Sequence, residues 1–204
     1  MDARTLIISA PAILFGLTIH EFMHGYVADK LGDPTAKLAG RLTLNPLKHL
    51  DLIGTVSLFL FRIGWAKPVP INPYNFADIK KGVILTSLAG PLANFLSALF
   101  FGISYRIINP SSFFFAYLLR SFVFYNLILA FFNLLPIPPL DGSKIFMYIL
   151  PYKYREYYME VESYGFYILI GLIFIGSLIG IPILWEIIWP FISFFYQIFT
   201  GALI

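Results

Sequence analysis

A His-Glu-x-x-His motif lies inside the first apolar segment of this chain, at His20, Glu21 and His24. Residues four apart share one face of a helix, so the two imidazoles can bind one zinc ion, and the glutamate between them can reach a water molecule that the metal activates. A catalytic zinc site needs a third protein ligand. Asp141, in the segment Pro-Pro-Leu-Asp-Gly at 138–142, is the candidate. These residues indicate hydrolysis, with Zn²⁺ as cofactor and Glu21 as general base.

Each of these assignments has a simpler alternative. The motif could be a polar stripe packed against another helix, but a carboxylate in a membrane-spanning helix costs roughly 2.5 to 3.5 kcal/mol. That cost favours a metal beside Glu21. Asp141 could be an ordinary turn residue, because its segment is also a good β-turn sequence. It follows a broken apolar helix at a matching depth, however, and this coincidence favours a metal ligand.

Three more polar residues are candidates for contact with a substrate. The tetrahedral intermediate of peptide hydrolysis needs a hydrogen-bond donor for its oxyanion, and Asn133 and Asn94 are amides in apolar segments that can supply one. Both could instead hold helices together through interhelical hydrogen bonds. His49 could bind substrate from a loop or orient a ligand, although a capped turn explains it almost as well. We predict a catalytic role for Asn133 and substrate contacts for Asn94 and His49.

The composition is that of a polytopic membrane protein. Of 204 residues, 59% are hydrophobic and 12% are charged, whereas soluble domains have about 25% charged residues. The chain has no cysteine, which excludes disulfides, thiolate ligands and cysteine nucleophiles. The basic residues lie mainly between apolar segments rather than along one face, so no nucleic acid is expected as a partner.

The apolar segments predict an all-α fold with about five transmembrane helices. A bilayer core of roughly 30 Å needs about 20 apolar residues per helix. Segments of that kind lie at 4–29, 80–107, 113–150, 162–180 and 182–200. Prolines at 136, 138 and 139 break the third segment before Asp141. Between the first and second of these segments, region 37–64 shows short apolar runs with β-like alternation, which predicts a small membrane-embedded β-hairpin or re-entrant region.

The distribution of basic residues predicts the orientation in the membrane. Eleven of the 14 lysines and arginines lie between Lys30 and Lys81 or between Lys144 and Arg155. A five-span chain places both regions on one side, which the positive-inside rule assigns to the cytoplasm. The amino terminus is then outside, the carboxyl terminus is cytoplasmic, and the active site lies toward the cytoplasmic side of the cell membrane.

With these motifs in place, the chain resembles the site-2 protease family of intramembrane zinc metalloproteases. The resemblance rests on the histidine motif, on Asn-Pro-x-x-His-x-Asp at 45–51, on Ala-Gly-Pro-x-x-Asn at 89–94, and on Asn133 eight residues before Asp141. It implies a catalytic core over residues 1–150, followed by an interfacial loop and two transmembrane helices over 151–204. It also implies a compact family form without a PDZ domain or a nucleotide-sensing domain, and so no nucleotide partner.

The resemblance implies a zinc-dependent endopeptidase that cleaves peptide bonds in or near transmembrane segments, as in regulated intramembrane proteolysis. Its partners would be transmembrane protein substrates and the lipid bilayer, and a regulatory membrane partner stays an open alternative. Two other functions compete with this interpretation. A divalent-metal transporter or channel also places carboxylates within the membrane, and a catalytically silent relative could act as a membrane scaffold.

Overall fold

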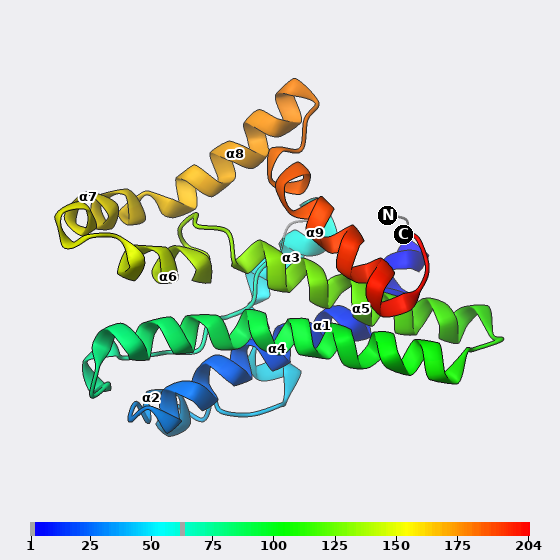
Figure 1. Cartoon of the computed structure of the whole chain (residues 1–204), viewed down its shortest axis with the longest axis horizontal. Coiled ribbons are helices and arrows are strands. Elements are labelled where there is room, and N and C mark those ends of the chain that lie inside the picture. The colour runs from blue at the N-terminus through cyan, green and yellow to red at the C-terminus, as the bar shows by residue number, and fades with distance from the viewer. Residues whose placement is uncertain (1–2, 62–63) are drawn as a thin grey trace.

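The computed structural model describes residues 3–61 and 64–204 and is helical throughout its regular part (Figure 1). In chain order, the helices are α1 (Ala3–Lys30), α2 (Thr35–Leu38), η1 (Pro46–Lys48), α3 (Leu52–Phe61), η2 (Pro73–Asn75), α4 (Ile79–Ile108), α5 (Phe113–Asn133), α6 (Asp141–Ile149), α7 (Tyr152–Ser163), α8 (Gly165–Ile179) and α9 (Ile183–Thr200). Over these residues no strand forms, and the antiparallel bridge between Leu50 and Ala66 is isolated.

The prediction of an all-α polytopic membrane protein is confirmed. Four helices are long and apolar enough to cross a bilayer, namely α1 from Ile7 onward, α4, α5 and α9. A fifth span forms if α7 and α8 count as one, and this pair is bent by 67° at Tyr164. The third predicted segment divides as expected, because α5 ends at Asn133 and α6 begins at Asp141.

The predicted β-hairpin in region 37–64 is wrong for the residues that the structure describes. The apolar run at 52–61 is helix α3, which satisfies the backbone within one segment, as membrane burial requires. The alternation at 37–46 is overridden by local hydrogen bonds, of which Asn45 provides one by accepting from the Leu47 N–H at 3.0 Å. The re-entrant placement of this region stays a prediction.

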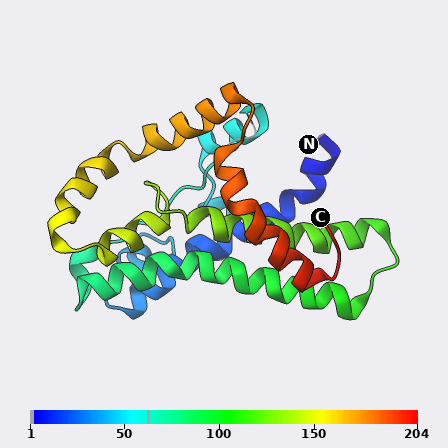
Figure 2. The same ribbon diagram turned by 45° about the horizontal axis from the view of Figure 1, so that its top comes forward.

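The predicted interfacial loop after residue 151 is a helix, α7. Helix α8 has 15 residues and is therefore about 22 Å long, shorter than a bilayer core. In Figures 1 and 2, α7 and α8 form an arm that leaves the other helices beside α6 and returns to them through α9. An apolar groove of about 590 Å³ lies between α5, α8 and α9.

Helix α9 packs across α4 and α5 and completes the largest apolar core. Its buried members include Val123, Leu127 and Ile192. Gly102 permits close packing there, because a Cβ at that position would lie 2.5 Å from the Phe199 Cβ. Arg106 of α4 and Arg120 of α5 hold the carboxyl-terminal end of α9. Arg106 donates to the Ile198 carbonyl at 2.5 Å, and Arg120 donates to the Tyr196 hydroxyl at 2.6 Å and to the Leu203 carbonyl at 3.0 Å.

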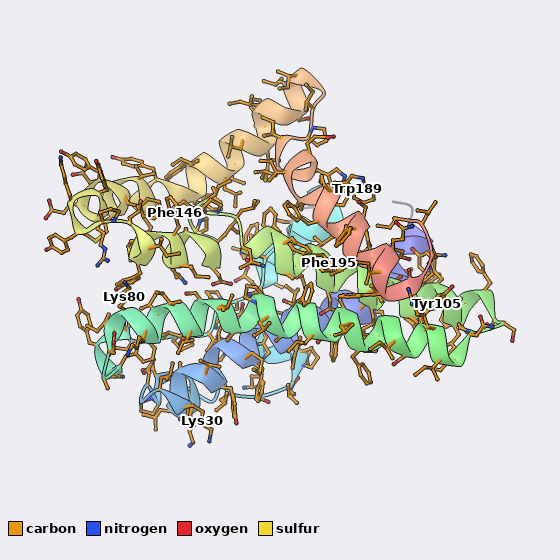
Figure 3. The ribbon with its side chains drawn as sticks, in the orientation of Figure 1. Lys30, Lys80, Tyr105, Phe146, Trp189 and Phe195 are labelled. Carbon is orange, nitrogen blue, oxygen red and sulfur yellow. The ribbon has the colours of Figure 1, made fainter. Side chains whose placement is uncertain are left out.

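Helices α1 and α4 run antiparallel, so the end of α1 and the start of α4 lie together (Figure 1). Lys30 and Lys80 are at one end of the molecule, and Tyr105 is near the other (Figure 3). Phe146 of α6 lies toward the same end as Lys80. The second half of α1, the first half of α4 and the start of α6 are thereby brought together, and these three segments carry the candidate site.

Candidate metal centre

His20, His24 and Asp141 form one compact buried group. The Asp141 Oδ2 atom lies 3.1 Å from the Nε2 atom of each histidine, and the three residues are 5 to 8% exposed. The two rings are perpendicular, with centroids 4.5 Å apart. Ligand atoms about 2.0 to 2.1 Å from a tetrahedral zinc ion lie about 3.3 Å apart. The spacing of this group therefore fits one zinc ion, and these are the three ligands that the sequence predicts.

Hydrogen bonds behind the histidines decide which ring nitrogen faces the group. His24 Nδ1 lies 2.7 Å from the Thr86 carbonyl, which can only accept, so Nδ1 carries the proton. His20 Nδ1 lies 2.6 Å from Asn94 Oδ1. The Asn94 amide nitrogen donates to Gly16 and Asn126, so its oxygen is the acceptor for His20. Both neutral rings therefore turn the Nε2 lone pair toward Asp141.

This arrangement brings three hydrogen-bond acceptors to one point. Two imidazole lone pairs and a carboxylate oxygen repel one another unless a cation or a proton lies between them. Nitrogen and oxygen ligands of this kind suit Zn²⁺, and partners that fix the second ring nitrogen are typical of metal-binding histidines. These three ligand atoms thus fit a resident zinc ion, which His20, His24 and Asp141 would hold.

Two glycines allow the ligand-bearing helices to approach one another. A Cβ at Gly90 would lie 2.6 Å from His24 Nε2 and 2.7 Å from His20 Cε1, so α4 contacts both rings only because this residue has no side chain. A Cβ at Gly142 would lie 2.2 Å from the Leu134 carbonyl oxygen. Gly142 thereby lets the start of α6 pack on the end of α5. Asp141 lies in the first turn of α6, where the helix dipole favours an anion.

Glu21 lies next to the group and is partly exposed. Its Oε2 atom accepts a hydrogen bond of 2.8 Å from the backbone N–H of Val69, in an extended segment 48 residues further along the chain. One carboxylate oxygen is therefore held by the backbone. The other is the oxygen through which a general base could reach a water molecule.

Of the three other predicted site residues, Asn94 is hydrogen-bonded to His20 of the group, whereas Asn133 and His49 donate to backbone carbonyls of their own segments. Asn94 is fully buried, and its oxygen and both amide hydrogens are engaged with His20, Gly16 and Asn126. Asn133 donates to the Leu129 carbonyl at 2.9 Å, one turn back on α5. His49 is buried in its own loop, where Nε2 donates to the Thr43 carbonyl at 2.7 Å.

Sequence reasoning missed four groups around the site. They are the Val69 N–H, the Thr86 carbonyl, the Asn126 amide and the Lys144 ammonium, which lies 4.0 Å from Asp141 Oδ1. Lys144 is one helical turn after Asp141, and Asn126 is two turns before Asn133 on α5. Helical spacing could have identified these two residues. The backbone groups carry no signal in the side-chain sequence.

Fold and site together define a polytopic membrane protein with a buried group of two histidines and one carboxylate that could bind a metal ion. Residues 110–176 match peptidase family M50. The chain is 38% identical over 184 residues to a Bacillus subtilis protein named "Putative zinc metalloprotease YwhC". The matched region covers 86% of this chain and 83% of that relative.

Two relatives with names of the same form are also similar. MJ0611 of Methanocaldococcus jannaschii is 35% identical over 68% of this chain and 69% of its own, and Rip2 of Mycolicibacterium smegmatis is 30% identical over 81% and 66%. No solved structure matches. The chain belongs to peptidase family M50, the site-2 protease family, as the sequence motifs predict.

Proposed function

We propose that this chain is a zinc-dependent intramembrane endopeptidase that hydrolyses peptide bonds in or near transmembrane segments of other membrane proteins. The observation that supports it is the convergence of His20, His24 and Asp141 within 3.1 Å contacts beside Glu21, on helices apolar enough to span a bilayer. The family and the names of its members agree with a metalloprotease. The division into a catalytic core over 1–150 and an accessory part over 151–204 belongs to the same proposal.

The catalytic roles follow from the chemistry of the side chains. The zinc ion, when bound, supplies an acidified water molecule and a Lewis acid for the scissile carbonyl. Glu21 takes the proton from the attacking water through its free oxygen and then delivers a proton to the leaving amine. Val69 keeps the other oxygen of Glu21 in place during both transfers. Burial of the site limits competing water and strengthens these electrostatic interactions.

Asn94 acts in this proposal by orienting a ligand rather than by contacting substrate. Its oxygen fixes the proton on His20 Nδ1 and so keeps Nε2 free for the metal. Asn133 uses one amide hydrogen for the Leu129 carbonyl and has a second hydrogen for an oxyanion. We therefore retain Asn133 as the candidate oxyanion donor. His49 supports its loop.

The substrate must be unwound before it is cut. A transmembrane helix has its backbone hydrogen bonds satisfied internally, so helix-weakening residues near the cleavage site would favour its entry. The expected orientation has the amino terminus outside and the site toward the cytoplasm, since Lys30 and Lys80 lie at one end of the molecule (Figure 3). Cleavage would then occur near the cytoplasmic side, as in regulated intramembrane proteolysis.

The test is cleavage of designed single-span substrates by the purified protein in detergent. Wild type is compared with Glu21→Gln, with chelator-treated wild type, and with Glu186→Gln as the matched control, because Glu186 is an exposed carboxylate on α9. We expect cleavage inside the membrane segment by wild type and by Glu186→Gln. Glu21→Gln should retain zinc and lose at least 10²-fold in rate, as for loss of a general base. Zinc flux into liposomes without any cleavage would refute the protease proposal and favour a transporter.

A further inference from the structure

Asp33 is a buried carboxylate that the proposed mechanism does not use. It follows α1 and has no exposed surface. It accepts hydrogen bonds from the Thr35 backbone N–H at 3.1 Å and from the Thr35 hydroxyl. It also accepts from the Asn72 N–H and from the Asn75 side-chain amide, both at 2.7 Å. A buried carboxylate is retained at low cost only where donors of this number surround it.

One of these donors, Asn72, belongs to the segment that holds Glu21, and Asn75 lies in η2, which directly follows that segment. Asn72 lies three residues after Val69, so the contact of Asp33 fixes one end of the extended segment 66–72. The other end is fixed by Lys67, whose carbonyl accepts from Arg41 at 2.7 Å and whose N–H donates to the His49 carbonyl at 2.8 Å. Hydrogen bonds thus hold the segment on both sides of Val69.

The sequence of this segment restricts how it can shift. Pro68 and Pro70 flank Val69, and because each proline fixes φ and lacks an N–H, Val69 carries the one donor between Lys67 and Ile71. The Val69 side chain is buried against α1 at Gly25, where an added Cβ would lie 3.2 Å from Val69 Cγ1. Gly25 is one helical turn after Glu21. The segment therefore lies along the face of α1 that carries the base.

We propose that Asp33 is a positioning residue for Glu21, which it serves by holding segment 66–72 so that the Val69 N–H stays on Glu21 Oε2. The inference rests on the proposed function of Glu21 as general base. Asp33 then affects the rate of the chemical step through the backbone of segment 66–72. A residue that only capped the turn after α1 would not have this effect.

The test compares Asp33→Asn with wild type by two independent measurements. The variant replaces two acceptor oxygens by one and should release segment 66–72. We expect kcat to fall about 10- to 100-fold, the range for misplacement of a catalytic group by about 1 Å, with KM and bound zinc unchanged. We also expect faster amide hydrogen exchange in peptides that cover 66–72. Their few exchanging amides include Val69, because prolines contribute none.

Two variants complete the design. Asp29→Asn is the matched control, because Asp29 is a carboxylate on the last turn of α1 that pairs with Lys37 at 3.5 Å, and it should leave both readouts unchanged. Asn75→Ala removes one donor to Asp33 and should shift both readouts less, in the same direction. This milder variant carries the test if Asp33→Asn does not fold.

The outcomes separate this inference from the proposed function. Unchanged exchange over 66–72 in Asp33→Asn and Asn75→Ala would overturn the inference, whatever the activity. Faster exchange with unchanged kcat in an active enzyme would also overturn it, because the segment would then not govern Glu21. An inactive wild type with normal zinc content would contradict the proposed function instead, since the exchange measurement requires no substrate.

Discussion

Gly90 offers the sharpest test of the metal centre, because its missing side chain decides how closely α4 approaches both histidines. In Gly90→Ala the new Cβ would lie 2.6 Å from His24 Nε2 and 2.7 Å from His20 Cε1, whereas ordinary contact begins at 3.4 Å. The rings and the α4 backbone must therefore separate by about 0.8 Å, while metal-ligand distances tolerate about 0.2 Å. The displaced atom His24 Nε2 is itself the ligand atom.

We expect the zinc affinity of Gly90→Ala to fall by at least the 10- to 100-fold that loss of an outer partner costs, which is about 1.4 to 2.8 kcal/mol of binding free energy. The assay is competition with a chromophoric zinc chelator in detergent. Gly171→Ala on α8 is the matched control, because a Cβ there meets nothing within 4 Å. Alanine favours helix over glycine by up to about 1 kcal/mol, so neither variant should unfold for local reasons. Equal zinc affinities in wild type, Gly90→Ala and Gly171→Ala would refute the reasoning.

Two further predictions concern groups behind the site. Asn94→Leu removes the acceptor for His20 Nδ1 and should weaken zinc binding about 10- to 100-fold in the same competition assay. Asn133→Leu should leave zinc binding unchanged, because Asn133 bonds to its own helix. The reverse order would contradict the assignment of Asn94 as the residue that orients His20. Burial opposes ionisation of Asp33, but hydrogen bonds from Thr35 and the asparagines outweigh it and lower its pKa below 3.8. The carboxylate therefore stabilises the metal-free protein at neutral pH. The difference in Tm between wild type and Asp33→Asn should be largest at pH 7 and should shrink as the pH falls below 3.8. A difference that grew on acidification would contradict this prediction.

The spanning helices could be predicted from the sequence because membrane burial makes an apolar length of about 20 residues a direct signal. Helix α4 begins and ends within one residue of the predicted segment 80–107. Helix α5 begins at the predicted residue 113, and the chain breaks before Asp141 as predicted. Region 37–64 could not be predicted in the same way. Its alternation favours a strand, but over such short runs periodicity decides little, and local and tertiary hydrogen bonds decide the outcome.

The grouping of His20, His24 and Asp141 could be predicted because each is a side chain in a motif with defined spacing. The groups that orient these residues and Glu21 could not, since two of them, the Thr86 carbonyl and the Val69 N–H, are backbone groups whose position depends on the folding of distant segments. Asn94 illustrates the difference. The sequence predicts it as a functional amide, but only the packing of α1, α4 and α5 shows that its oxygen faces His20.

The charge of the centre explains how it can lie within apolar helices. With Zn²⁺ bound, the carboxylates of Asp141 and Glu21 balance the two positive charges of the metal, and the histidines contribute none in the neutral form that Thr86 and Asn94 impose. A neutral cluster avoids most of the desolvation cost of burying single charges. Lys144 lies toward solvent at the edge of the group, with a partly exposed ammonium 4.0 Å from Asp141. The positive charge of Lys144 is therefore placed where water can reach it, and the bound metal is what balances the two carboxylates.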